Sequence, residues 1–122
     1  MRALASEYGA RMTMPLSVAG AFHTHYMAPA VAPLVAALQQ VVISSPRIPV
    51  VSNVDARPHS DPDDIRTTLA MQVTSPVRWE SIITAMVTAD AFEECYELGP
   101  GTVCRGIVKR FGKKLKVNSI RA

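Results

Sequence analysis

The sequence has few cysteines and no long apolar run. Its 122 residues include only two cysteines, Cys95 and Cys104, too few for a disulfide framework, which favours a reducing compartment. No stretch approaches the roughly 20 consecutive apolar residues that a membrane-spanning helix needs. Glu7 and Arg11 interrupt the first residues, where a secretory signal would place its apolar centre. We therefore expect a soluble intracellular protein without a membrane-bound segment.

The balance of apolar and charged residues excludes a disordered chain. Apolar residues make up 48% of the sequence and charged residues 19%, a composition typical of a chain that buries a core. The length is sufficient for one domain with such a core and too short for two ordinary domains.

Acidic residues are absent after Gly101, whereas basic residues are frequent there. The basic residues of this run are Arg105, Lys109, Arg110, Lys113, Lys114, Lys116 and Arg121. Such a run suits an acidic partner, which would be nucleic acid, an acidic protein or a phosphate-bearing ligand, or it serves solubility alone. Nucleic acid is disfavoured, because the helix pattern predicts that Phe111, the one aromatic residue of the run, is buried and leaves no platform for stacking bases.

Short apolar strands are expected to alternate with helices. The expected strands cover residues 12–18, 48–54, 92–98 and 115–120. The expected helices cover residues 3–8, 30–38, 62–73, 76–87 and 103–111. This alternation predicts a layered α/β fold with a largely parallel sheet. The strand over residues 48–54 is apolar enough to be buried on both faces.

Two helix boundaries have clear local signals. Asp61 is a preferred N-cap residue, Pro62 suits the first helical position, and Asp63 and Asp64 would lie near the positive end of the helix dipole. Gly9 is expected to close the first helix, because glycine readily adopts the positive φ that is common at helix ends.

One histidine lies where a general base would be placed. His23 falls in a loop between an expected strand and an expected helix, beside small residues that let another group approach, although loop histidines without a catalytic role are common. His23 and His25 also have the spacing of a metal-binding pair. No third ligand is evident nearby, and Cys95 and Cys104 are not spaced as a zinc half-site, so no metal is expected.

Two further features have a functional and a structural interpretation. Gln72 lies near the end of a helix, where its amide would satisfy free carbonyl groups or its main chain would fix the tautomer of a neighbouring imidazole. The turn Gly99-Pro100-Gly101 leads into a helix whose free N–H groups could hold a phosphate. It lacks the spacing of a P-loop, and most such turns simply reverse the chain.

Four motifs together resemble one enzyme family. They are Leu16-Ser17-Val18-Ala19-Gly20-Ala21-Phe22-His23-Thr24 followed by Met27-Ala28-Pro29-Ala30; Val50-Val51-Ser52-Asn53-Val54-Asp55-Ala56; Gln72 with Ser75-Pro76-Val77-Arg78-Trp79; and Tyr96-Glu97-Leu98-Gly99-Pro100-Gly101 with Gly106, Lys109 and Arg110. In this order the motifs span nearly the whole chain and resemble the malonyl-CoA:acyl carrier protein transacylases.

The resemblance implies a ping-pong Ser–His mechanism without a cofactor. His23 corresponds to the general base, and Gln72 to the residue whose main-chain carbonyl accepts from the other ring nitrogen of the histidine. The implied partners are malonyl-CoA and acyl carrier protein. Phe22 corresponds to a position that leaves no room for the extra methyl of methylmalonyl groups, unless it only packs in the core.

The resemblance also implies that the sequence is a C-terminal part. The implied fold is part of a layered, mostly parallel-sheet α/β acyltransferase domain with a hydrolase-like core. Residues 1–18 would end a small ferredoxin-like subdomain, and residues 19–122 would be the C-terminal portion of the large subdomain. The compartment would be the cytoplasm, or a plastid or mitochondrion if a transit segment is missing.

The nucleophile of the family is missing from the sequence. Transacylases place their serine in a G-x-S-x-G motif before the histidine, and here Ser6 is the only serine upstream of the strand expected over residues 12–18. We therefore expect an incomplete enzyme. The chain would be a truncated gene model, the product of a split gene or one half of a two-chain enzyme. The alternative is an inactive module that binds the acidic carrier protein through residues 109–116.

Overall fold

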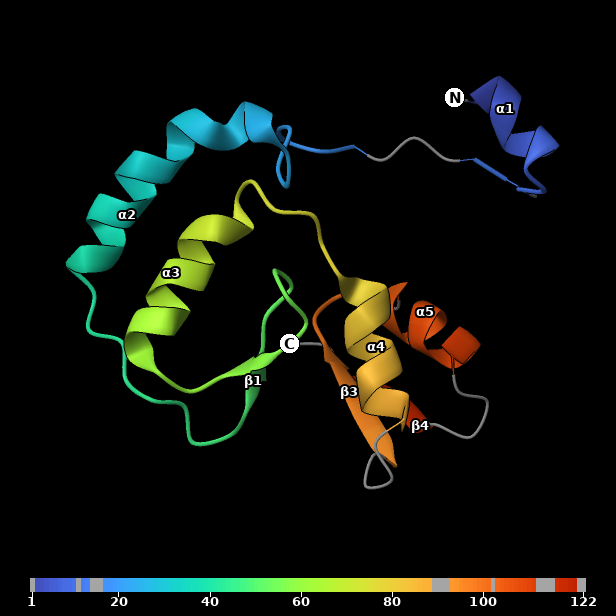
Figure 1. The fold of residues 1–122 in the computed structure, drawn as a ribbon. Coiled ribbons are helices and arrows are strands. Elements are labelled where there is room, and N and C mark those ends of the chain that lie inside the picture. Colours follow the sequence, from blue (N-terminus) through green and yellow to red (C-terminus); the bar gives the residue numbers. More distant parts are fainter. Residues whose placement is uncertain are drawn as a thin grey trace.

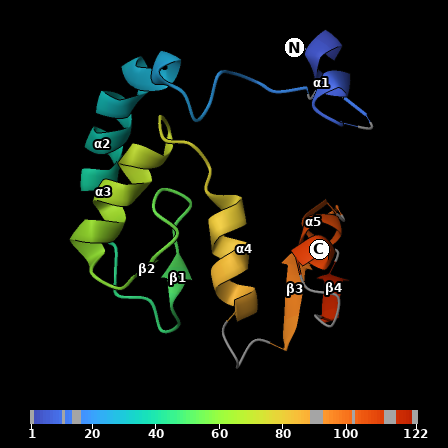
Figure 2. The ribbon, with the colours of Figure 1, turned by 45° about the vertical axis from the view of Figure 1, so that its right-hand side comes forward.

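The computed structural model describes residues 2–10, 12–13, 17–88, 93–101, 103–111 and 116–120. Two groups of elements lie beside each other, and α1 stands apart from both (Figures 1 and 2). The elements in chain order are α1 (Arg2–Glu7), the 3-10 helix η1 (His25–Ala30), α2 (Val31–Gln39), β1 (Val50–Val51), β2 (Pro58–His59), α3 (Pro62–Gln72), α4 (Trp79–Thr88), β3 (Glu94–Leu98), α5 (Val103–Phe111) and β4 (Lys116–Ile120).

Helix α1 ends as the sequence predicts. Gly9 follows the helix with a φ of +77°, and its N–H donates to the carbonyl of Ser6 at 3.1 Å. The strand expected over residues 12–18 is not found among the described residues of this range, which are 12–13 and 17–18. Its residues 14–16 lie outside the described residues, and the others have no regular structure.

The first group packs α2 against α3. The apolar stripe predicted for this segment is confirmed, because its members are partly buried while the residues between them, except Ala30, are exposed. These members are Met27, Val31, Leu34, Val35 and Leu38. The helix begins one residue after the expected Ala30, and η1, which contains Pro29, precedes it. The Arg66 guanidinium of α3 donates to the carbonyls of Leu38 and Val41, which joins α3 to the C-terminal end of α2 and the residues after it.

The predicted start of α3 is confirmed in detail. The Asp61 carboxylate accepts from the main-chain N–H groups of Asp63 at 2.9 Å and Asp64 at 3.0 Å, and Pro62 is the first helical residue. This cap fixes where the helix begins and therefore where its last turn lies.

The strand expected over residues 48–54 is corrected by the structure. Only Val50–Val51 form a strand, and they pair antiparallel with Pro58–His59. Val50 is 53% exposed, so the expected burial on both faces is wrong. The chain reverses too soon for a longer strand, because Ser52 N–H donates to the Arg57 carbonyl at 3.0 Å and Ala56 adopts a φ of +61°.

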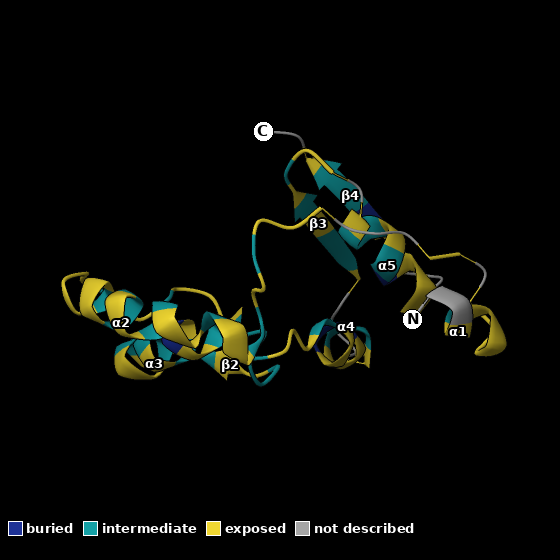
Figure 3. Cartoon of the chain, turned by 90° about the horizontal axis from the view of Figure 1, so that it is seen from above, coloured by how far each residue is buried: buried dark blue, intermediate teal, exposed yellow. Residues whose placement is uncertain are grey.

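The second group contains the predicted parallel pairing. β3 and β4 run parallel, with Glu94 opposite Lys116 and Leu98 opposite Ile120. Helices α4 and α5 pack beside them, and a small core forms from Ile83, Val108 and Val117. The few buried positions lie where α3 meets α2 and within this second group (Figure 3). The chain is therefore α/β, with one parallel and one antiparallel pair among the described residues.

The buried face of α5 differs from the predicted one. Val103 is 71% exposed and Phe111 is 40% exposed, whereas Val108 is 5% exposed. The buried face of α5 is thus shifted by one residue from the predicted face, so that it contains Cys104 and Val108. The burial of Phe111 that disfavoured nucleic acid is therefore wrong, and the absence of a nucleic-acid partner stays a prediction.

A carboxylate fixes the first turn of α5. The Glu97 side chain accepts from the main-chain N–H groups of Cys104 and Arg105, both at 2.9 Å. These are the groups that a phosphate would have used at the Gly99-Pro100-Gly101 turn, so the phosphate site considered for this turn is not supported. The Cys104 and Arg105 N–H groups already donate to a side chain at the end of β3.

In the described part of the chain, none of the helices is both long enough and apolar enough to cross a membrane.

The Glu97 cap predicts a pH dependence of stability. The main-chain hydrogen bond from Arg105, with that from Cys104, holds the pKa of the Glu97 carboxyl below its usual value. The cap therefore stabilises the fold above the unfolded-state pKa and is lost as pH falls through the folded-state pKa. In Glu97→Gln the amide keeps one acceptor oxygen but has no charge. The free energy of unfolding of this variant should therefore fall less than that of wild type as the pH is lowered.

Chemical unfolding of both proteins from pH 7 down to pH 3 checks this. The stability difference between wild type and Glu97→Gln should shrink as the pH falls. A difference that is constant over this range would contradict the charged cap.

Candidate active site

His23 occupies a turn that connects residue 20 to η1. Its φ is +65°, in the left-handed region that residues other than glycine rarely adopt. Its main-chain N–H donates to the carbonyl of Val73 at 2.9 Å, which joins the turn to the segment that follows α3. The side chain is partly buried and is therefore neither sealed in the core nor free in solvent.

Two carbonyl groups lie against one nitrogen of the His23 ring. Nδ1 is 3.0 Å from the carbonyl oxygen of Gln72 and 3.2 Å from that of Ser75. Carbonyl oxygens only accept hydrogen bonds, so in the neutral ring this geometry favours a proton on Nδ1. Nε2 then has the free lone pair and is the basic atom of the ring.

The end of α3 explains why the Gln72 carbonyl is free. In a continuing α-helix the carbonyl of residue 72 would accept from the N–H of residue 76. Residue 76 is a proline, which has no N–H and which also disfavours a helical conformation at Ser75. The helix therefore ends at Gln72, and the imidazole takes the place of the missing donor.

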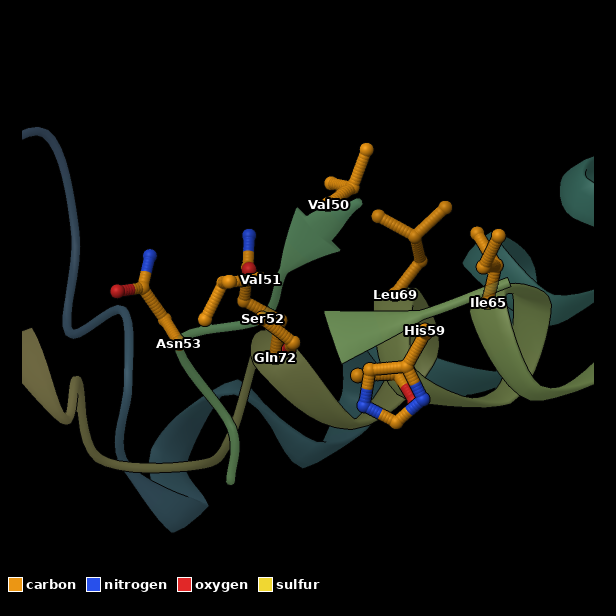
Figure 4. Close-up of a pocket in the computed structure, with 9 residues that line it drawn as sticks. Val50, Val51, Ser52, Asn53, His59, Ile65, Leu69 and Gln72 are labelled. Carbon is orange, nitrogen blue, oxygen red and sulfur yellow. The ribbon is translucent and has the colours of Figure 1, made fainter. Parts of the chain in front are cut away.

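Gln72 contributes its main chain and its side chain to different places. Its side chain lines a cavity of about 130 Å³ between the β1–β2 hairpin and α3, together with Val50, Ser52, His59 and Leu69 (Figure 4). The interaction with His23 uses only the carbonyl oxygen. The identity of the side chain is thus not what holds the imidazole.

Phe22 lies beside His23 and is 53% exposed, so it is not a core residue of this structure. Its ring covers Gly20, where an added Cβ would come 3.4 Å from Cε2 of the phenyl ring. The aromatic side chain therefore presents an open apolar surface next to the imidazole.

The other reactive residues do not join this site as ligands or nucleophiles. The His25 ring contacts the Tyr26 ring in a tilted arrangement, with ring centroids 4.1 Å apart. Among the described residues, no group of three or more His, Cys, Asp or Glu side chains could hold a metal ion. Burial raises the pKa of the Cys95 and Cys104 thiols, which disfavours the thiolate form at both positions.

Sequence reasoning missed three contributors to the site. These are the carbonyl of Ser75, the carbonyl of Val73 and the proline that frees the Gln72 carbonyl. A signal for the last was present, because Gln72 and Pro76 stand four residues apart at the end of a predicted helix. The two carbonyls are main-chain groups whose position depends on the tertiary fold.

The chain is similar in sequence to known transacylases, although no family model matches it. The malonyl CoA-acyl carrier protein transacylase of Bacillus subtilis is 38% identical over 117 residues, which are 96% of this chain and 37% of that protein. The mitochondrial malonyl-CoA-acyl carrier protein transacylase of Homo sapiens is 41% identical over 107 residues, which are 85% of this chain and 27% of that protein.

Solved structures show the same relationship. An acyl carrier protein S-malonyltransferase from Vibrio cholerae superimposes with a TM-score of 0.85 at 36% identity, over 97% of this chain and 38% of that one. A malonyl-transacylase in complex with a type II polyketide acyl-carrier protein superimposes with a TM-score of 0.81 at 30% identity. The match covers 96% of this chain and 37% of that one. The chain spans between 27% and 38% of the length of these relatives. In sequence and in structure, the chain is similar to the C-terminal part of the malonyl-CoA–acyl carrier protein transacylases.

Proposed function

We propose that this chain provides the general base of a Ser–His site that transfers malonyl groups from malonyl-CoA to the phosphopantetheine thiol of acyl carrier protein. The observation that supports this most directly is the contact of His23 Nδ1 with the Gln72 carbonyl at 3.0 Å, which leaves Nε2 to accept a proton. The names of the relatives supply the substrates of the proposal.

The proposed reaction has two halves that use the same ring nitrogen. His23 Nε2 takes the proton of a serine hydroxyl as its oxygen attacks the thioester carbonyl, and it then gives this proton to the departing thiolate of coenzyme A. In the second half Nε2 takes the proton of the phosphopantetheine thiol as its sulfur attacks the malonyl-serine ester. The proton then returns to the serine oxygen.

A neutral acceptor suits a substrate that has its own negative charge. A carboxylate behind the imidazole would hold the tautomer equally well, as aspartate does in hydrolase triads. It would also place a second negative charge near the malonyl carboxylate, which costs interaction energy in a partly desolvated site. The carbonyls of Gln72 and Ser75 orient the ring without that charge.

The serine of the proposed mechanism must come from polypeptide outside this sequence. The 122 residues contain no G-x-S-x-G motif. We propose that the N-terminal part of a transacylase, as a separate chain or as a longer form of this one, supplies the nucleophile and the carboxylate-binding group.

A carrier-binding module without activity is the second candidate. Lys109 and Arg110 in the last turn of α5 are both exposed, so they are available to an acidic carrier protein. This candidate predicts carrier binding without any role for His23, and the experiment below distinguishes the two.

The test is a chimera that restores the missing part. The purified chain alone should not transfer malonyl groups from malonyl-CoA to acyl carrier protein. If it replaces the matching segment of the Bacillus subtilis transacylase, the chimera should be active, and His23→Ala should lower its kcat by about 10²–10⁴-fold. Activity of the isolated chain, or a His23→Ala chimera as active as its parent, would contradict the proposal.

A pair of substitutions tests the main-chain role of residue 72. In the chimera Gln72→Ala should change the transfer rate by less than about threefold, because the carbonyl is kept. Pro76→Ala restores an N–H that competes for this carbonyl, and it should lower kcat by about 10- to 100-fold. Steady-state kinetics of both variants measure this, and the opposite order of effects would show that the Gln72 side chain is the functional group.

Phe22 provides a test of substrate selectivity. We propose that its ring lies beside the acyl α-carbon and excludes a methyl group there. In the chimera Phe22→Ser should raise the ratio of methylmalonyl to malonyl kcat/KM by about tenfold, the scale of one methyl group in a binding pocket. An unchanged ratio would remove Phe22 from the selectivity site and leave the role of His23 intact.

A further inference from the structure

We propose that Thr24 is a positioning residue that holds His23 in its functional conformation, an inference that rests on the proposed role of His23. The conformation needs support, because a φ of +65° places the Cβ of a non-glycine residue close to its own main chain. In an exposed turn a histidine would relax from this region unless neighbouring contacts fix it.

The hydroxyl of Thr24 makes contacts on both sides of His23. Oγ1 donates to the carbonyl of Ala21 at 2.7 Å and accepts from the N–H of Tyr26 at 3.3 Å. The first bond joins the two ends of the turn that contains Phe22 and His23. The second caps the N-terminus of η1, which begins at His25.

These two bonds complement the contacts that His23 makes with the end of α3. The Val73 carbonyl holds the main chain of His23, and the Gln72 carbonyl holds its ring. Both contacts lie on the α3 side of the turn. Thr24 holds the other side of the turn, because its bond to Ala21 closes the main chain around His23 and so fixes the direction in which the His23 side chain leaves the main chain.

A threonine suits this place for two reasons. Its φ of −136° and ψ of 163° lie in the extended region that β-branched residues prefer. Its hydroxyl can donate and accept at once, which neither a valine nor an alanine side chain can do. Serine would keep the hydroxyl and lose only the methyl group.

The first experiment measures hydrogen exchange of the His23 main-chain amide in the 122-residue chain. In Thr24→Val this amide should exchange about tenfold faster than in wild type, and in Thr24→Ser within about threefold of wild type. The matched control is Thr88→Val, which removes a hydroxyl that donates to the Thr84 carbonyl at 2.8 Å at the far end of α4. This control should leave the exchange of His23 unchanged.

The second experiment measures kinetics in the chimera described above. Thr24→Val should lower kcat at least tenfold with little change in KM for malonyl-CoA, and Thr24→Ser should restore most of the rate. Wild-type exchange and kcat in Thr24→Val would overturn the proposal, and so would equal losses in the valine and serine variants. Faster exchange with an unchanged kcat would overturn the catalytic part. A chimera that is inactive in every form would refute the proposed function, while the exchange data would still decide whether Thr24 positions His23.

Discussion

The candidate site depends on one hydrogen bond between a loop and the end of a helix. His23 Nδ1 lies 3.0 Å from the carbonyl oxygen of Gln72, an acceptor that is free only because α3 ends there. The proline at position 76 has no N–H, so the Gln72 carbonyl has no main-chain donor within the helix and can accept from another group. The His23 imidazole is the donor, and this hydrogen bond to the Gln72 carbonyl fixes the orientation and the tautomer of the ring.

Most of the first group of elements fixes the position of that helix end. The Asp61 cap sets where α3 begins, and the contact of Arg66 with the end of α2 sets how α3 lies against its neighbour. The N–H of Arg78 donates to the Asn53 carbonyl at 3.1 Å, which ties the segment after Pro76 to the β1–β2 hairpin. The acceptors therefore belong to a segment held at both ends, whereas the histidine lies on a turn that needs contacts of its own.

Sequence patterns were sufficient where the physical cause was local. Asp61 and Gly9 act on neighbouring N–H and carbonyl groups, so the helix ends that they define could be predicted. The face of α5 could not, because the contact of Glu97 with Cys104 and Arg105 joins a strand to a helix. The extent of β1 was also missed, since it depends on how soon residues 52–57 reverse the chain.

Some parts of the candidate site could likewise be predicted from the sequence, and others could not. Residue types and motif resemblance pointed to His23 and Gln72, and the structure brings their atoms within hydrogen-bonding distance. The contributions of Ser75 and Val73 come from main-chain carbonyls, which have no signature in the residue type. Thr24 has an ordinary side chain whose two bonds become evident only when the turn is seen in three dimensions.

The most direct measurement is the tautomer of the His23 ring, from ¹⁵N chemical shifts of the labelled chain at a pH where the imidazole is neutral. We predict that the proton resides on Nδ1, which donates to the carbonyls at the end of α3, and that Nε2 shows the chemical shift of an unprotonated nitrogen. A ring protonated on Nε2 would contradict it, because the atom assigned to receive the proton of the nucleophile would already hold one.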